Sequence, residues 1–526
     1  MSGPLTHRRI SPWVWACLGF FLLSRAPIIW CPNELNVDES QMAAQAMRYA
    51  HDLTPWRSVE GESNGPLDSW LLLAVHDLGL PYGYRTLHGT AALLLAAILL
   101  LTYHAGRRLA GDAAALIGLA AGCWWLAWAP VQEFEHYASE LVPCLLLSGA
   151  VALLVSATRE PGRLSVRRAF GAGLLLGLMP WGKLQAAPVA LALGGWALVD
   201  AFAFTSVRLP GRGRYAAALL AGAIGPSVLL LGWVIRAGAG EEMWRAYVIA
   251  GLAHTAPRTW LEHLRYIRDL AFLQPASPWF CGTALLAVSA LWLHRKADGA
   301  VAGRTLGLVA VLLLAGAYAT LRPITQWAHY ALFCLGALVL GSSVAARSLL
   351  AARQRLRRRA GAAVLVIGLV PLPVAYFVRD NDLRDYLRTW HYESSHSFDG
   401  QAFLAHAVRY YAPQTKSLAV WGWKPSLYVD LGVAPAVRNA GFVYLHDGNP
   451  AQEFLREGFM RDLQQSAPDT IVDVEDYIWR GQRRTGPETF PALARLLAEH
   501  YRPAGQGRAE YTADDSLIIN VYVRER

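Results

Sequence analysis

The chain has 526 residues, of which 54% are hydrophobic and only 17% charged, and its mean hydropathy is +0.26. Because soluble domains are about a quarter charged, these values exclude an ordinary soluble protein and predict an integral membrane protein. The net charge of +9 comes from short Arg clusters between apolar runs, so it does not indicate a nucleic-acid partner. No P-loop or dinucleotide fingerprint occurs, which disfavours an ATP or nucleotide-sugar mechanism.

Apolar windows of roughly 17 to 25 residues predict a mainly α-helical, polytopic protein with about eleven transmembrane helices. The windows are 13–30, 84–104, 113–130, 140–157, 169–182, 184–205, 215–235, 276–294, 304–321, 328–346 and 361–378. Pro180 and Pro188 interrupt the region 169–205, so we expect two short helices that meet near Trp181-Gly182-Lys183.

The loops between these windows alternate in their content of Arg and Lys, which should collect on the cytoplasmic side. Arg8 and Arg9 precede the first window, and the run from Arg353 to Arg359 precedes the last. The pattern predicts a multi-pass protein of the cytoplasmic (inner) membrane with its N-terminus in the cytoplasm. The loop of Asp38 and Glu39, the turn from Glu133 to Glu140 and everything after about residue 378 then lie outside.

The pattern predicts two domains. Residues 1–378 form a transmembrane module whose first outer loop, 31–83, carries two helices at the membrane surface, 38–51 and 66–80. Residues 379–526 form a small extracytoplasmic α/β domain, because helix-like stretches alternate with β-type runs. The helix-like stretches are 398–411, 451–465 and 490–500, and the β-type runs are 417–423, 470–474 and 517–523.

Asn36-Val37-Asp38-Glu39-Ser40-Gln41 follows the first apolar run and has two readings. Asn36 is a good N-cap and Glu39 comes three residues later, which fits a capping box. Asp38 and Glu39 are also adjacent carboxylates at the outer membrane boundary, where a carboxylate can act as a functional acid or base. The two readings are compatible, because a cap can fix a functional carboxylate in place.

Ionisable residues from several loops gather at this boundary, and such groups at membrane depth are either paired or functional. They are Asp38, Glu39, Asp68, Glu133, Glu135, His136, Glu140, Lys183, Arg236, Arg322 and His329. A cavity with both carboxylates and cations suits a reaction in which a base activates a hydroxyl while a phosphate leaves. Asp38 is the candidate base, and Lys183, Arg236, Arg322 and His329 are the candidates for binding the phosphate.

The acidic pair, followed by Pro66-Leu67-Asp68-Ser69-Trp70-Leu71, resembles C-type (GT-C) membrane glycosyltransferases. The resemblance is to the group that contains protein O-mannosyltransferases and the bacterial aminoarabinose transferase of lipid A. Further matches in the same order are Arg107-Arg108-Leu109-Ala110-Gly111, Tyr137-Ala138-Ser139-Glu140, Gly177 to Lys183, His329-Tyr330 and Val420-Trp421-Gly422-Trp423-Lys424-Pro425.

The resemblance implies a GT-C fold and transfer of a sugar, with inversion, from a polyprenyl-phosphate donor to a lipid, glycan or protein acceptor outside the membrane. It puts Asp38 at the position of the catalytic base, with Glu39 beside it. The expected substrate contacts are Glu140, His136, Tyr137, Trp70 and Asp68. The chain departs from the family in two places, since relatives often carry Lys where it has Gly65 and Asp where it has Glu140.

No cofactor is expected, and we assign no metal ligands. Glu133, Glu135, His136 and Glu140 have the chemistry to bind a divalent cation, which leaves a metal site as the lesser alternative. A lipid or glycan transporter (flippase) with an outward anion-binding cavity is the rival function. No internal repeat supports it, and the charges gather at one face of the membrane.

Overall fold

The structure is a computed structural model. It describes residues 10–61, 64–128, 132–158, 164–203, 211–253, 259, 261–262, 265, 303–323, 327–351, 396–440, 443–445, 448–475, 486–512 and 515–525. The predicted spans 276–294 and 361–378 lie outside these residues.

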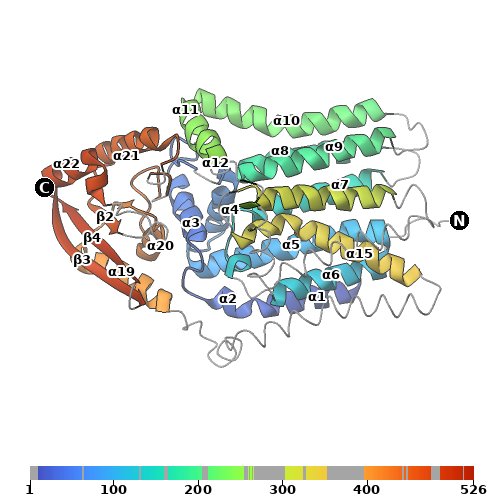
Figure 1. Cartoon of the computed structure of the whole chain (residues 1–526), viewed down its shortest axis with the longest axis horizontal. Coiled ribbons are helices and arrows are strands. Elements are labelled where there is room, and N and C mark those ends of the chain that lie inside the picture. Colours follow the sequence, from blue (N-terminus) through green and yellow to red (C-terminus); the bar gives the residue numbers. More distant parts are fainter. Residues whose placement is uncertain are drawn as a thin grey trace.

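Apolar helices of different lengths run side by side through one half of the molecule (Figure 1). They are α1 (Pro12–Ser24), α2 (Ala26–Trp30), α5 (Tyr84–Ala110), α6 (Asp112–Trp128), α7 (Leu141–Thr158), α8 (Val166–Gly182), α9 (Ala187–Ala203), α10 (Arg212–Arg236), the helix Gly303–Leu321 and α15 (Leu335–Ala351). Within the described residues, five helices are long and apolar enough to cross a membrane, and three shorter ones are also apolar. The chain is a multi-pass membrane protein, and each predicted window in the described residues coincides with helix.

The first apolar run is divided at Arg25, which lies between α1 and α2 and is only 3% exposed. Its guanidinium donates to the carboxylate of Glu135 (2.8 Å) and to the carbonyl oxygen of Leu126 (2.7 Å). A buried charge is tolerated only when it is paired and hydrogen-bonded. The arginine therefore ties the first apolar run to the turn from Glu133 to Glu140, which we call the second outer loop.

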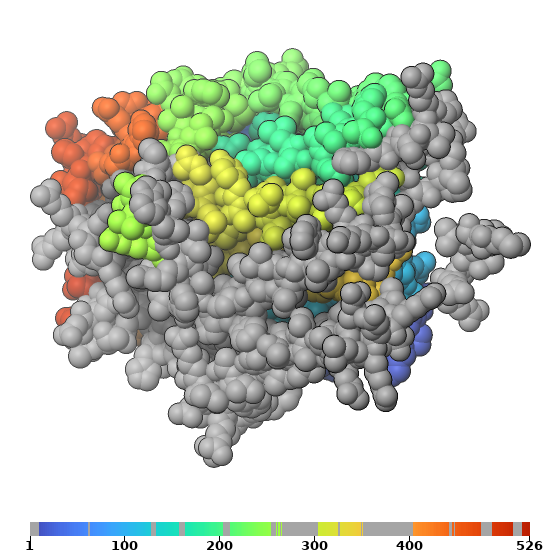
Figure 2. All heavy atoms as spheres, turned by 45° about the vertical axis from the view of Figure 1, so that its right-hand side comes forward, coloured from blue at the N-terminus to red at the C-terminus, as the bar shows by residue number. Residues whose placement is uncertain are grey.

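Small residues let α8 and α10 approach closely. Gly173 and Gly177 of α8 form a Gly-x-x-x-Gly pair, and a Cβ on either would overlap the backbone of Leu219 or Ala223 in α10. Close backbone contact through small residues is a common way to pack membrane helices. Figure 2 shows α10 (green) beside α8 and α9 (teal), with the helix Gly303–Leu321 (yellow) next to them.

The predicted pair of short helices in 169–205 is confirmed. α8 ends at Gly182, a 3-10 turn η2 (Leu184–Ala186) follows, and α9 begins at Ala187. Pro180 lies in the last turn of α8, where it removes a hydrogen-bond donor, and Pro188 lies in the first turn of α9, where no donor is needed. Lys183 is left in extended conformation at the junction.

The first outer loop forms α3 (Val37–Tyr49) and α4 (Pro66–Asp77), as expected. Figure 1 shows α3 between the transmembrane helices and the C-terminal domain, in contact with α4, α5 and α20. All but three of its residues are buried. α3 is therefore enclosed by protein on most sides, and its expected place at the membrane surface stays a prediction.

The C-terminal part folds as a mixed four-stranded sheet in the order β1-β2-β4-β3, with β1 and β2 parallel and the other pairs antiparallel. The strands are β1 (Leu418–Trp421), β2 (Thr470–Glu475), β3 (Tyr501–Thr512) and β4 (Asp515–Arg524), and the helices are α19 (His396–Tyr411), α20 (Ser426–Leu431), α21 (Gln452–Ser466) and α22 (Pro491–His500). Helices cover both faces. Leu418 and Val420 pack toward α19, whereas Ala419 and Trp421 pack toward α21 and α22.

The C-terminal domain is packed directly on the first outer loop. One hydrophobic cluster joins Trp56 and Trp181 to Trp421 and Phe459, so the two cores are continuous there. Two polar pairs cross the same junction. Lys424 binds Glu34 (2.8 Å), with both side chains 3% exposed, and Asn439 donates to Glu60 (2.6 Å). The domain is thereby fixed over one end of the helices.

Candidate functional site

Asp38 lies in the first turn of α3, where Asn36 fixes the backbone. The side-chain oxygen of Asn36 accepts from the amide of Asp38 (2.9 Å), and its amide donates to Glu133 (2.8 Å). The cap is therefore present and also links the first outer loop to the second. The Asp38 side chain is 25% exposed, so a substrate hydroxyl can reach its carboxylate.

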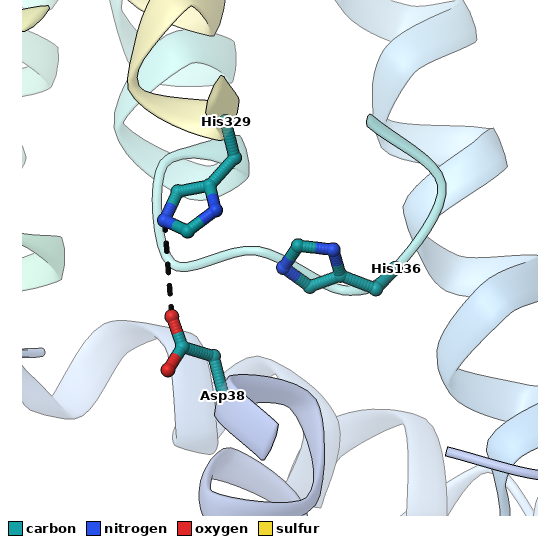
Figure 3. A group of neighbouring side chains, drawn as sticks. All are labelled: Asp38, His136 and His329. Carbon is teal, nitrogen blue, oxygen red and sulfur yellow. Dashed lines mark ion pairs between the residues drawn. The ribbon is translucent and has the colours of Figure 1, made fainter. Parts of the chain in front are cut away.

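Three parts of the chain bring Asp38, His136 and His329 together (Figure 3). Nε2 of His329 lies 3.8 Å from the carboxylate of Asp38 and 3.8 Å from that of Glu140, and makes no hydrogen bond within the described residues. Its Nδ1 is bonded to Glu133. Burial alone would raise the pKa of Glu133, but the adjacent charge of His329 and the hydrogen bonds lower it to about 2. Glu133 therefore stays ionised and orients His329 toward Asp38.

Lys183 and Glu140 form a buried ion pair next to this group. Lys183 Nζ binds the carboxylate of Glu140, donates to the hydroxyl of Ser139 (2.7 Å) and lies 4.8 Å from the centre of the Tyr330 ring. Burial disfavours the charge on Glu140, yet Lys183 and His329 lower its pKa below the ordinary value. The pair keeps a cation at membrane depth because its charge is balanced.

Glu39 points away from Asp38 into the protein and is fully buried. Its oxygens accept from the amides of Leu35 (2.6 Å) and Tyr137 (3.3 Å), and it pairs with His88 (3.2 Å). Burial raises the pKa of Glu39, but the charge and hydrogen bond of His88 outweigh it and lower the pKa. The carboxylate thus holds three separate segments around Asp38.

Asp68 is buried in the first turn of α4, and neither of its carboxylate oxygens has a hydrogen-bond partner among the described residues. Burial raises its pKa well above the ordinary value, opposed by the charge of Lys183 and reinforced by that of Glu140. Burial thus disfavours the charged form of this carboxyl. Tyr137 donates to its backbone oxygen (2.9 Å), which ties α4 to the second outer loop.

A cavity of about 220 Å³ opens beside Lys183. Arg322 also lines it, together with the aromatic rings of Tyr247, Tyr318, Tyr330 and Tyr444. The cavity therefore offers two cations and four rings to one ligand. Lys183 connects the cavity to the group around Asp38, because its partner Glu140 lies 3.8 Å from His329.

The fold is similar to that of two solved proteins. It matches ArnT from Cupriavidus metallidurans, crystallised with bound undecaprenyl phosphate, over 97% of this chain and 97% of that chain, with a TM-score of 0.57 and 14% identity. The chain has the GT-C fold. The oligosaccharyltransferase of Archaeoglobus fulgidus, crystallised with a tethered acceptor peptide, matches over 88% of this chain and 70% of that chain, with a TM-score of 0.51 and 11% identity. No family model and no curated protein matches the sequence.

Three of the residues predicted for the site lie elsewhere in this GT-C fold. Arg236 is exposed at the end of α10 and does not line the cavity. Trp70 packs against Tyr49 and Trp233, with ring centres 6.0 and 5.6 Å apart, and so serves the core. Glu135 binds Arg25.

The structure suggests another ligand set for a metal ion than the sequence did. Among the described residues, Asp38, His136 and His329 offer ligand atoms that lie within 4.8 Å of one another (Figure 3). His329 faces Asp38 with Nε2, and its other ring nitrogen, Nδ1, is bonded to Glu133. Metal-binding histidines commonly have such a carboxylate on the nitrogen that does not bind the metal. Of the four residues that the sequence suggested, only His136 belongs to this group.

Several residues that build the site carried no signal in the sequence. Tyr247, Tyr318 and Tyr444 enter only through the fold, because each lies on a different element from the acids. Ser139 was visible only as part of the motif that ends in Glu140. Tyr330 was visible only as the neighbour of His329. Hydroxyl and aromatic residues are common in membrane helices, so they could not be singled out without their positions.

Proposed function

We propose that the protein transfers a sugar from a polyprenyl-phosphate donor to an acceptor on the outer face of the cytoplasmic membrane, with inversion. One observation carries the proposal. The partly exposed carboxylate of Asp38 lies 3.8 Å from His329, which lies 3.8 Å from Glu140, and Glu140 pairs with Lys183. Lys183 and Arg322 line an aromatic cavity. A candidate base and a candidate anion site are therefore connected through two side chains, which suits the reaction.

In the proposed reaction, the acceptor hydroxyl attacks the anomeric carbon while the bond from that carbon to the phosphate oxygen breaks. The proton of the hydroxyl goes to Asp38, and the bonding electrons leave with the phosphate. Lys183 and Arg322 balance the charge that grows on the phosphate, which is where fixed cations lower the barrier. Attack from the face opposite the phosphate inverts the anomeric centre.

The other residues near Asp38 act on its position and environment. Glu39 and Tyr137 hold the loops together, so we assign them positioning roles. His329, held by Glu133, lies near Asp38 and Glu140 and is suited to contact the phosphate or the acceptor. His136 borders the same space, and the buried carboxyl of Asp68 lies within electrostatic reach of Lys183.

The carrier is proposed from the cation-lined cavity and from the comparison. Undecaprenyl phosphate is bound in the structure of ArnT, which has the same fold over nearly its whole length. A phosphate held by Lys183 and Arg322 suits such a lipid, because the cavity lies at the outer ends of membrane helices. The acceptor is a lipid, glycan or protein hydroxyl.

Asp38→Asn tests the proposal directly. The amide keeps the shape of the side chain but cannot take a proton, so sugar transfer should fall by about 100-fold or more. Binding of undecaprenyl phosphate should stay unchanged, because Lys183 and Arg322 remain. The assay follows sugar release from a panel of polyprenyl-phosphate sugars by detergent-purified protein.

Two controls separate the alternatives. Because Asp38 is also a possible metal ligand, wild-type transfer is repeated with EDTA, and we expect no loss, since Lys183 and Arg322 already balance the phosphate. Loss that a divalent cation restores would instead make Asp38 a ligand. Full transfer by Asp38→Asn would refute its role as base, and lipid movement across vesicles without sugar release would indicate a transporter.

A further inference from the structure

One wall of the cavity comes from the C-terminal domain. The short helix η5 (Val443–Leu445) carries Tyr444 to the cavity that Lys183 and Arg322 line, where the side chain is 1% exposed. The other lining residues belong to the transmembrane half, on η2, α9, η3 (Met243–Ile249), α12 (Ala250–Ala253), the helix Gly303–Leu321 and the segment that follows it, and η4 (Ala328–Cys334). Among the described residues, Tyr444 alone links the domain to this cavity.

The position of Tyr444 is set by the core of the domain. Asn449 donates to the backbone oxygen of Tyr444 (2.8 Å), and Arg456 donates to that of Leu445 (2.7 Å). The guanidinium of Arg456 lies over the rings of Trp421 (5.8 Å) and Phe490 (5.2 Å). η5 is thus tied to both α21 and the sheet, so the ring is presented by a rigid support.

The lining of the cavity divides by chemistry. Lys183 and Arg322 suit a phosphate, whereas the tyrosine rings offer flat apolar faces. A sugar has apolar C–H faces that pack on such rings, and hydroxyls that a phosphate lacks. At about 220 Å³ the cavity is smaller than pockets for drug-sized ligands, which begin near 300 Å³, so it suits one sugar rather than an oligosaccharide.

We propose that Tyr444 is a donor-specificity residue, through which the C-terminal domain contacts the single sugar on the carrier phosphate. The inference rests on the proposed function and deepens it. In this inference the transmembrane half binds the phosphate of the donor, and the C-terminal domain contributes to binding of the sugar. Tyr444 then affects donors that carry a sugar and leaves the bare carrier nearly unaffected.

The test compares two lipids on full-length protein in detergent. Kd is measured by tryptophan fluorescence for undecaprenyl phosphate and for undecaprenyl phosphate carrying mannose, glucose, galactose or aminoarabinose. Tyr444→Leu keeps an apolar side chain but removes the ring, so it should weaken binding of the tightest sugar-bearing lipid by about tenfold. Its Kd for undecaprenyl phosphate should change by less than about twofold, and Tyr444→Phe should bind both lipids as the wild type does.

Tyr501→Leu is the matched control, because Tyr501 is another buried tyrosine of the same domain and bonds to Pro468 (2.9 Å) away from the cavity. It should leave both values of Kd unchanged. Equal weakening of both lipids by Tyr444→Leu, no weakening of either, or a wild type that does not discriminate sugar-bearing from bare lipid would each overturn the inference. A wild type that binds none of these lipids would instead overturn the proposed function.

Discussion

Gly65 shows how one residue shapes the site. Its amide donates to the backbone oxygen of Gly182 (2.6 Å), and a Cβ at this position would overlap the carbonyl of Trp181. No side chain fits there, so the Lys that the resemblance implies at this position could not be accommodated. The contact holds the first outer loop against the end of α8, and Lys183, the first residue after α8, brings a cation to the same place.

Gly65→Ala should therefore push the loop away from α8. Overpacking of this kind costs about 1–3 kcal/mol, so we expect a lower melting temperature and weaker binding of undecaprenyl phosphate. Gly83→Ala serves as the control, because Gly83 also lies in the first outer loop and has open space around it. Equal melting temperatures for the two variants would show that the loop can yield.

For single residues, the sequence predicted which ionisable side chains belong to the site but not which of them pair with one another. Asp38, Glu140, Lys183 and His329 were chosen as ionisable groups at one membrane boundary, and the structure brings them together. The pairing of Glu39 with His88 could not be predicted, because the distance between them depends on how α3 packs on α5.

At the scale of elements, hydrophobic periodicity predicted the helices of the described membrane part but missed one strand. β3 contains Pro503, Gly505 and Gly507, which weaken a strand signal. It lies at the edge of the sheet, where one side needs no ladder hydrogen bonds and a bulge between Pro503 and Gly505 is tolerated. Edge position is a property of the fold, so the sequence pattern could not show it.

The close contact between helices α8 and α10 can be tested by substitution of Gly177. Gly177→Leu places a side chain where the backbone of Ala223 lies, so the two helices must separate, at a cost of about 1–3 kcal/mol. Since α8 ends beside Lys183, binding of undecaprenyl phosphate should weaken as well. The melting temperature in detergent and Kd measure the two effects.

Gly225→Leu is the control for this substitution. Gly225 lies on α10, and a Cβ there meets nothing within 4 Å. This variant should melt and bind as the wild type does. A loss as large as that of Gly177→Leu would mean that added bulk on either helix, rather than this contact, is responsible.

For the whole molecule, the sequence predicted a helical part and an outer α/β domain but not how they join. The junction is made by residues hundreds of positions apart, such as Glu34 with Lys424 and Glu60 with Asn439. Nothing local marks these side chains as partners. The continuous hydrophobic cluster around Trp181 and Trp421 was hidden for the same reason.

Two carboxyls at this junction make it sensitive to pH. Burial raises the pKa of Glu60 to about 7, and burial with the nearby charge of Glu34 raises that of Asp430 to about 7. The folded state thus binds protons more tightly than the unfolded state. The stability from these groups is complete below about pH 4 and is lost as the pH rises through about 7.

We therefore expect the melting temperature to fall between about pH 4 and about pH 7, and the double variant Glu60→Gln with Asp430→Asn to flatten this dependence. Glu453→Gln, on the exposed surface of the same domain, should leave it unchanged. Thermal unfolding in detergent across this range measures the effect. An unaltered slope in the double variant would assign the dependence to other groups.

The pairing of Arg25 with Glu135 has a consequence for the order in which the protein is made. The two residues are 110 positions apart, so at about 5–20 residues per second the arginine is synthesised roughly 5 to 20 seconds before its partner. During that interval the first apolar run is complete, but its guanidinium lacks both Glu135 and the carbonyl of Leu126. The final position of Arg25 can therefore form only after the segment that carries these two partners has been synthesised.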